Sequence, residues 1–250
     1  MLALITGASS GMGRDMARVL AEKGYDLILV ARRKEKLDKL AKELNTNVKT
    51  IKLDLSVEEN CFKLYESVKN KDVDIVINNA GFGLFGEFHE TDLDTELKMI
   101  DLNIKAYHIL TKLFLKDFIK KDKGYILNVC SSAGFMAGPR LSTYYATKNY
   151  VTKLTMAINE ELRRDGSNVY IGTLCPGPFN TEFNKVAGVE FGLKGLESHD
   201  VANYAIKKMF NKKVVIIPGI KMKLAIFASH LVPDKLLVKI TAKIQKKKAK

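Results

Sequence analysis

Residues 2–13 read LALITGASSGMG, an apolar strand that runs directly into a loop with three glycines. The amphipathic run 14–23 follows, so the segment predicts a strand, a loop and a helix in succession. Glycine lets backbone amides approach an anion without interference from a Cβ atom, and a helix N-terminus adds positive potential at the same point. A pyrophosphate needs both properties, so the loop predicts a dinucleotide site. The alternative is a tight turn that uses glycine only for its shape.

Strand-like and helix-like runs alternate along the rest of the chain. We expect strands near residues 2–6, 26–31, 48–53, 74–78, 124–130, 168–174 and 214–217, and helices near 12–23, 34–45, 57–70, 92–121, 143–164 and 199–211. Strands joined by crossover helices pair in parallel, with helices on both faces of the sheet. The order predicts an α/β, doubly wound Rossmann fold with a seven-stranded parallel sheet. We expect a single catalytic domain over 1–220 and a basic helical extension over 221–250 that packs on it or flanks it.

The net charge of +13 is concentrated at the C-terminal end of the chain. Nine lysines and one acid fall in residues 221–250, so this tail carries eight of the thirteen net charges. An apolar stripe of Leu236, Leu237, Ile240 and Ile244 predicts an amphipathic helix from about residue 235, with lysines on its other face. Such a helix docks on its own subunit or a partner, which we favour, or lies on an anionic membrane surface. Because the basic residues lack aromatic stacking partners, we expect no nucleic acid.

The cysteines and histidines indicate neither a metal site nor a disulfide framework. Cys61, Cys130 and Cys175 lack the spacing of metal ligands, and the four histidines are scattered singly. An odd number of cysteines cannot pair fully within one chain, which indicates a reducing, cytoplasmic compartment. We expect no signal peptide, since the first strand begins at residue 2.

Small and polar residues follow six of the expected strands, at the point where each strand ends. They are the glycine loop 7–13, Arg32-Arg33, Asp54, Asn78-Asn79-Ala80-Gly81, Ser131-Ser132 and Pro176-Gly177. In a doubly wound sheet, ligands bind beyond the carboxyl ends of the strands. Any one of these motifs also fits an ordinary loop, but six at the same edge of one sheet favour a site.

Tyr144 and Lys148 are four residues apart and so share one face of the expected helix 143–164. A nearby ammonium favours the phenolate and lowers the phenol pKa, which allows a tyrosine to act as a general acid and base. The same spacing occurs at Tyr65/Lys69 and Tyr204/Lys208, where we expect solvated helix faces. Only the middle pair has a serine, Ser131, thirteen residues before the tyrosine at the end of a strand.

Taken together, these motifs resemble those of the short-chain dehydrogenase/reductase family over roughly residues 1–217. The residues that carry the resemblance are Thr6-Gly-x-x-x-Gly11-x-Gly13, Asn78-Asn-Ala-Gly81, Asn103, Ser131, Tyr144-x-x-x-Lys148 and Pro176-Gly177. The resemblance implies an NADP-dependent oxidoreductase that passes a hydride between C4 of a nicotinamide and a carbonyl or alcohol carbon.

The resemblance also implies a role for each of four residues. Tyr144 would donate a proton to the carbonyl oxygen in reduction and accept it in oxidation, while Ser131 would hold that oxygen by a hydrogen bond. Lys148 would bind the nicotinamide ribose and tune Tyr144, and Asn103 would anchor a water that links Lys148 to solvent. Ser132 is the alternative to Ser131, and an ordinary helix-surface asparagine is the alternative for Asn103.

The end of the second expected strand bears on the choice of cofactor. An acidic residue there binds the adenosine ribose of NAD, but this chain has the neutral Ala31 followed by Arg32 and Arg33. Since arginine binds phosphate in bidentate fashion, we predict NADP(H), with Arg32 as the main phosphate contact and Arg33 closer to a solvated helix start. Ser10 departs from the pattern, because some NADPH-preferring relatives have a basic residue there. The cofactor-binding residues that we expect are Gly7, Ser9, Ser10, Gly11, Met12, Gly13, Arg32, Arg33, Asp54, Leu55, Asn79, Ala80, Gly81, Tyr144, Lys148, Pro176, Gly177 and Thr181.

Apolar residues within 82–88, 135–140 and 176–198 indicate a pocket for an apolar or medium-sized carbonyl or alcohol substrate, with the last segment as its lid. The family pattern implies a homodimer or homotetramer through the helices near 92–121 and 143–164. Two alternatives stay open. One is a catalytically idle NADP-binding sensor or scaffold, and the other is an epimerase or dehydratase that consumes no cofactor.

Overall fold

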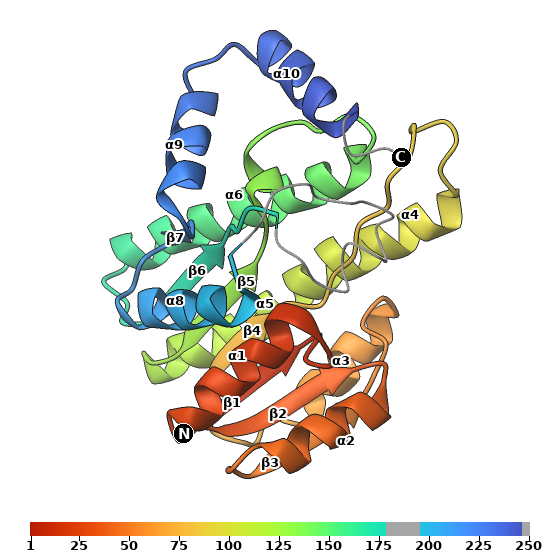
Figure 1. The fold of residues 1–250 in the computed structure, drawn as a ribbon. Helices are drawn as coiled ribbons and strands as arrows, with labels where there is room; N and C mark the ends of the chain where they lie inside the picture. The colour runs from red at the N-terminus through yellow and green to blue at the C-terminus, as the bar shows by residue number, and fades with distance from the viewer. Residues whose placement is uncertain (179–195, 247–250) are drawn as a thin grey trace.

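A seven-stranded parallel sheet forms the centre of the computed structural model, which describes residues 1–178 and 196–246 (Figure 1). The strands are β1 (Leu2–Thr6), β2 (Asp26–Ala31), β3 (Val48–Lys52), β4 (Val73–Asn78), β5 (Tyr125–Val129), β6 (Tyr170–Leu174) and β7 (Val215–Ile216). Their order across the sheet is β3-β2-β1-β4-β5-β6-β7. The chain reverses its direction of winding between β1 and β4, which is where doubly wound sheets bind their ligands. The fold is the one expected from the sequence.

Helices cover both faces of this sheet. On one face lie α1 (Gly11–Glu22), α2 (Lys34–Glu43) and α8 (Ser198–Phe210), and on the other lie α3 (Glu58–Glu66), α5 (Ala106–Lys121) and α6 (Ser142–Arg164). Side chains of β1 alternate between the two layers, because Ala3 and Ile5 join the core with α1 whereas Leu4 joins the core with α5. A strand that is covered on both sides is apolar throughout, which explains the continuous apolar runs in the sequence.

The helix expected over 92–121 consists of three segments. α4 (Leu93–Ile100) begins after Asp92, whose side chain accepts a hydrogen bond from the Thr95 amide (2.8 Å). A π-helical turn, Asp101–Lys105, follows and leads into α5. Turns of this kind occur most often at functional sites. This turn contains Asn103, which is fully buried.

Two further helices, α9 (Ile220–Ser229) and α10 (Asp234–Lys246), follow one another along the top of the molecule in Figure 1. The sequence pattern predicts α10 but not α9. Of the expected apolar stripe on α10, only Leu237 is buried, and Leu236, Ile240 and Ile244 are exposed. Of the expected alternatives, docking on the chain's own subunit therefore accounts for Leu237 alone, and the other three side chains of the stripe are not covered by the described residues.

The inner face of α10 carries two polar side chains beside Leu237, and they bond to polar groups of the domain. Thr241 Oγ1 donates a hydrogen bond to the Ala137 carbonyl (2.9 Å), and Gln245 Nε2 donates one to the Tyr145 hydroxyl. Both Thr241 and Gln245 are buried. The helix is thus held by hydrogen bonds, and most of its apolar surface faces outward.

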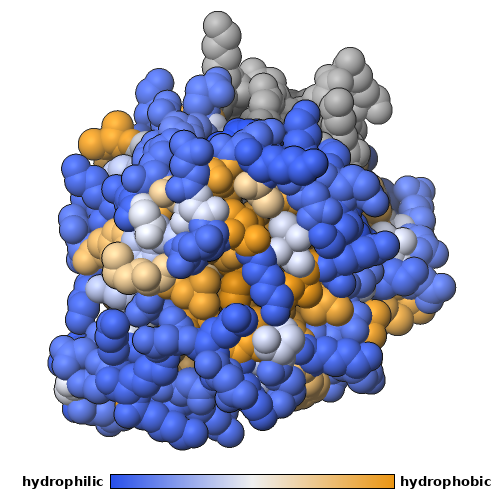
Figure 2. Space-filling model, turned by 90° about the horizontal axis from the view of Figure 1, so that it is seen from below, coloured by the Kyte–Doolittle hydropathy of each residue, from blue (hydrophilic) through white to orange (hydrophobic). Residues whose placement is uncertain are grey.

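Apolar side chains also gather elsewhere at the surface. Figure 2 shows them in the centre of the face seen from below, with polar and charged residues around them. Exposed apolar side chains such as Leu97, Ile119 and Met156 occur on α4, α5 and α6. No helix within the described ranges has both the length and the apolar character needed to cross a bilayer.

Candidate active site

The glycine loop is fixed by side chains at the ends of β1 and β4. Thr6 Oγ1 accepts hydrogen bonds from the backbone amides of Asn79 (2.9 Å) and Ala80 (3.1 Å). In return, Asn79 Nδ2 donates to the carbonyl oxygens of Thr6 (2.9 Å) and Gly7 (3.3 Å). These bonds join the loop after β1 to the loop after β4, so the two loops act as one rigid unit.

Glycine is required at two positions of this unit. Gly7 has a φ of +65°, and a Cβ atom there would lie 2.8 Å from the Cα atom of Ala80. A Cβ atom at Gly13 would lie 2.6 Å from the carbonyl oxygen of Gly7. α1 begins at Gly11 without a side-chain cap from Ser10, so the first amides of the helix remain available beside the loop. Such a helix start is a binding site for an anionic group.

Two arginines at the end of β2 lie beside the loop. Arg33 donates hydrogen bonds to the hydroxyls of Ser9 (3.1 Å) and Ser10 (2.8 Å). Arg32 Nη1 lies 3.9 Å from a carboxylate oxygen of Asp54, and the Arg32 side chain is 68% exposed. Arg33 is exposed, as expected for a solvated helix start, but its guanidinium also contacts the glycine loop directly.

Tyr144 and Ser131 are brought together by the start of α6 and the segment after β5. Both side chains line the same cavity, and the Ser131 side chain acts on the Tyr144 hydroxyl by lowering the pKa of the phenol. Ser131 Oγ also accepts a hydrogen bond from the Ala133 amide (3.2 Å), which caps the 3₁₀ turn Ser132–Phe135 and fixes the serine side chain. The two residues that the sequence analysis paired by their spacing are thus direct neighbours.

Lys148 lies one turn after Tyr144 and is buried. Its Nζ atom donates a hydrogen bond to the Val129 carbonyl (3.1 Å) and lies 5.9 Å from the centre of the Tyr144 ring. Burial lowers the pKa of the Lys148 ammonium and raises the pKa of the Tyr144 phenol well above its ordinary value, although the hydrogen bond with Ser131 opposes the latter shift. The expected lowering of the phenol pKa by Lys148 is not found, because removal of the phenol from water has the larger effect.

Asn103 connects the π turn to two other parts of the site. Its Nδ2 group donates to the Phe82 carbonyl (2.9 Å) and to Thr147 Oγ1 (3.2 Å), while its Oδ1 atom accepts from the Phe82 amide (3.2 Å). A side chain with these bonds and no exposed surface is not an ordinary helix-surface asparagine. It holds the loop after β4 against α6.

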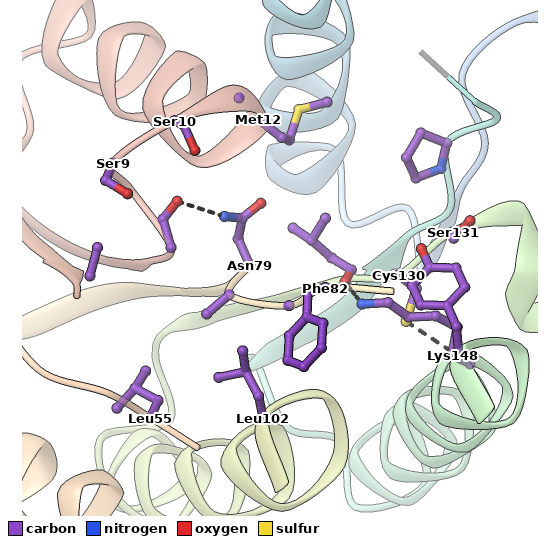
Figure 3. Close-up of a pocket in the computed structure, with 18 of the residues that line it drawn as sticks. Ser9, Ser10, Met12, Leu55, Asn79, Phe82, Leu102, Cys130, Ser131 and Lys148 are labelled. Atoms are coloured by element: carbon purple, nitrogen blue, oxygen red, sulfur yellow. Dashed lines mark hydrogen bonds between the residues drawn. The ribbon is translucent and has the colours of Figure 1, made fainter. Parts of the chain in front are cut away.

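These elements line a cavity of about 360 Å³ at the carboxyl edge of the sheet, a size typical of small-molecule sites. Figure 3 shows Ser9, Ser10 and Met12 on one side of it and Ser131 and Lys148 on the other, with Asn79 and Phe82 between them. The expected site residues that line it are Gly7, Ser9, Ser10, Gly11, Met12, Arg32, Arg33, Asp54, Leu55, Asn79, Ala80, Gly81, Ser131, Tyr144, Lys148, Pro176 and Gly177.

Two expected site residues within the described part of the chain, Gly13 and Asn103, do not line the cavity. Gly13 packs against Gly7, and Asn103 packs against Gly81 and Phe82, so both support the lining from behind. Thr181 lies outside the described residues, as does most of the expected lid 176–198.

Sequence reasoning left two contributors to the site without a role. Thr6 was named in the glycine motif, and the structure shows that its hydroxyl locks the glycine loop. Tyr145 lines the cavity beside Tyr144 and is bonded to Gln245, one hundred residues further along the chain. No local pattern shows a contact of that sequence separation.

The two other tyrosine–lysine pairs lie away from the cavity. Tyr65 Oη donates to Asp117 (2.7 Å), and the Tyr204 hydroxyl accepts from Lys223 (3.2 Å), and neither tyrosine lines the cavity. Across residues 1–178 and 196–246, no three His, Cys, Asp or Glu side chains gather in a way that could hold a metal ion.

Known proteins share both the sequence and the fold of this chain. A family model described as short chain dehydrogenase matches residues 1–189. An uncharacterized oxidoreductase of Staphylococcus epidermidis is 31% identical over 208 residues, which cover 82% of this chain and 89% of the relative. The very-long-chain 3-oxoacyl-CoA reductase of Homo sapiens is 31% identical over 194 residues, which cover 74% of this chain and 61% of that protein.

Among solved structures, a short-chain dehydrogenase from Sphingobium yanoikuyae in complex with NADPH is similar, with a TM-score of 0.81 and 31% identity. The similarity covers 88% of each chain. The stretch matched by the family model contains every residue expected to be catalytic and ends before α8.

Proposed function

Because the chain belongs to the short-chain dehydrogenase family and is therefore an oxidoreductase with a nicotinamide cofactor, we propose that it passes a hydride between NADPH and a carbonyl or alcohol carbon. The substrate in this proposal is apolar or of medium size. The observation that carries the proposal is that Ser131, Tyr144 and Lys148 line one wall of a cavity that continues to the glycine loop.

The residues around the glycine loop fit a dinucleotide phosphate. Backbone atoms lie so close to Gly7 and Gly13 that neither position has room for a Cβ atom. The start of α1 offers its free amides to a pyrophosphate. Arg32 is exposed and has only a long contact to Asp54, so its guanidinium can turn toward a 2′-phosphate. When bound, the nicotinamide supplies or accepts the hydride, and its oxidised form adds a positive charge near the phenol.

In this proposal Tyr144 is the proton donor for reduction and the acceptor for oxidation. Burial keeps its phenol protonated at neutral pH, which suits the donor role. Ser131 holds the substrate oxygen, and Lys148 binds the nicotinamide ribose. Asn103 is a positioning residue, since its three hydrogen bonds hold Phe82 and α6 at a fixed separation.

The cavity wall next to Tyr144 supports an apolar substrate. Phe82, Leu141 and Tyr145 line the cavity there, and Leu84 and Phe85 belong to the same apolar cluster. The human relative is a very-long-chain 3-oxoacyl-CoA reductase, which makes β-ketoacyl thioesters one substrate class to test here.

The test is NADPH oxidation by the purified protein against a panel of aldehydes, ketones and β-ketoacyl thioesters. Tyr144→Phe should abolish turnover while NADPH still binds, as followed by the fluorescence of the reduced nicotinamide. Tyr204→Phe is the matched control, because Tyr204 has the same spacing to a lysine but lies outside the cavity. Turnover that persists in Tyr144→Phe would assign the proton transfer to another group.

The two alternatives give different results in the same assay. An idle sensor or scaffold would bind NADPH but turn over no member of the panel. An epimerase or dehydratase would form product without net NADPH consumption. We also propose a homodimer or homotetramer through α4, α5 and α6, which carry the exposed Leu97, Ile119 and Met156, and light scattering measures this state directly.

A further inference from the structure

α10 carries its apolar side chains on the outside. Leu236, Ile240 and Ile244 are 52%, 42% and 51% exposed, and their spacing of four residues places them on one face. The opposite face is buried through Thr241 and Gln245, which are hydrogen-bonded to the rest of the protein. A helix that only packs on its own domain shows the reverse arrangement, with its apolar face inward.

α9 repeats this arrangement. Ile220, Leu224, Phe227 and the following Leu231 are each more than 60% exposed, and their spacing again places them on one helix face. Ile226 is buried on the inner side. Seven of the seventeen large apolar side chains exposed in the described residues fall within 220–244, so the concentration here is local rather than general.

Lysines surround these two apolar rows. The exposed lysines of this region are Lys221, Lys223, Lys235, Lys239, Lys243 and Lys246. Asp234 is the only acid between residue 220 and the end of the chain, and the sequence adds three more lysines after Lys246. The region therefore combines outward apolar side chains with a strong positive charge.

Neither half of this combination is explained by the proposed catalytic site. The family model ends at residue 189, so α9 and α10 lie outside the part of the chain that it matches. Thr241 and Gln245 hold α10 on the protein, and the apolar row on its other face stays exposed.

Apolar side chains flanked by lysines are the chemistry of helices that lie on an anionic bilayer, with the apolar row in the acyl boundary and the ammonium groups at the headgroups. We propose that α9 and α10 form a docking surface for a membrane that contains anionic lipids. The inner face of α10 is bonded to Tyr145, which lines the cavity. A membrane on the outer face of α10 would therefore lie near the cavity, with the helix between them.

Two other occupants fit less well. A two-fold contact with a second copy of the chain would place this basic surface against itself, and like charges repel. A nucleic acid would match the charge but leave the apolar rows in water, and residues 220–250 offer only the rings of Phe227 and His230 for a base to stack on.

The experiment is co-sedimentation of the full chain with vesicles of phosphatidylcholine alone or of phosphatidylcholine mixed with phosphatidylglycerol. We expect binding to the mixed vesicles, little binding to the neutral ones, and a decrease as salt is added. Leu236→Ser/Ile240→Ser/Ile244→Ser should lower the partition coefficient by about tenfold or more. Lys239→Gln and Lys243→Gln should each lower it by about fivefold, which corresponds to about 1 kcal/mol per lysine near an anionic surface.

Val57→Ser/Phe62→Ser is the matched control, since these two side chains are 46% and 45% exposed but lie at α3. It should bind vesicles as the unaltered protein does, and NADPH binding and the thermal midpoint check that every variant is folded. The proposal is overturned if the unaltered protein does not sediment with the mixed vesicles. It is equally overturned if the triple serine variant binds them undiminished, or if that variant changes only the oligomeric state.

Discussion

Replacing Arg32 and Arg33 separately by alanine should separate two roles that the sequence alone does not distinguish. Arg32 is 68% exposed, and among the described residues its ion-pair partner is a carboxylate oxygen of Asp54 at 3.9 Å. Arg33 instead holds the hydroxyls of Ser9 and Ser10 in the glycine loop. We therefore expect Arg32 to act on cofactor choice and Arg33 to act on the binding of either cofactor.

The magnitudes follow from the bonds that are lost. A charge-assisted hydrogen bond contributes about 1.5–3 kcal/mol, so Arg32→Ala should lower kcat/KM with NADPH by about 10- to 150-fold. With NADH the change should stay below about threefold, because no 2′-phosphate is present. The bonds of Arg33 to the neutral, partly solvated hydroxyls of Ser9 and Ser10 contribute about 1–2 kcal/mol together, so Arg33→Ala should cost about 5- to 30-fold with both cofactors.

The assay is steady-state kinetics with each cofactor at a saturating concentration of whichever carbonyl compound the panel identifies. Urea unfolding is the control, and Arg32→Ala should change the unfolding free energy by less than about 0.5 kcal/mol, since an exposed, long ion pair stabilises little. An unchanged ratio of NADPH to NADH efficiency in Arg32→Ala would refute the reasoning. So would a loss in Arg33→Ala that is confined to NADPH.

Three further predictions concern buried groups. Asn103→Ala should lower the unfolding free energy by about 2–4 kcal/mol in urea titrations, because it leaves the amide and carbonyl of Phe82 without their partner; a loss below about 0.5 kcal/mol would contradict this. Burial raises the pKa of Tyr107, Tyr144 and Tyr170 above the ordinary value of 10.0. The contribution of these protonated phenols to the free energy of unfolding is therefore complete below about pH 10 and is lost as the pH rises through their raised pKa values. The thermal midpoint should accordingly fall above about pH 10, and a midpoint that stays constant to about pH 11 would show that these phenols do not matter. Cys61, Cys130 and Cys175 are buried, and burial raises the pKa of Cys61 to about 12. A thiol reagent should therefore label the native protein far more slowly than the urea-unfolded chain. Equal labelling rates would contradict this prediction.

The sequence was most informative where a local pattern has one physical solution. The apolar runs 2–5 and 75–77 predict strands covered on both sides, near 2–6 and 74–78, and the sheet has strands there. The glycines at 7 and 13 predict close backbone approach, and Cβ atoms at both positions would overlap neighbouring atoms. The spacing of Ser131 and Tyr144 also predicts that the two side chains meet, and both line the same cavity.

The sequence was least informative where the outcome depends on a distant partner. The periodicity of Leu236, Ile240 and Ile244 predicts an apolar face but not the side of the helix that the protein buries, which is decided by the Ala137 carbonyl and the Tyr145 hydroxyl. The π turn at Asp101–Lys105 leaves no mark in helix propensity. The direction of the Tyr144 pKa shift depends on how deeply the phenol is removed from water, which residue spacing does not show.

The hydrogen bond between Gln245 and Tyr145 also decides where a foreign sequence can be attached to this protein. An affinity tag or a fluorescent fusion behind Lys250 would begin only a few residues after Gln245, which is hydrogen-bonded to a lining residue of the candidate active-site cavity. Met1, by contrast, is 68% exposed and directly precedes β1, so it lies at the amino ends of the strands, away from the cavity at their carboxyl ends. Purification handles and surface immobilisation therefore belong at the amino terminus, and kinetics recorded on a carboxyl-terminal fusion would report the handle as well as the enzyme.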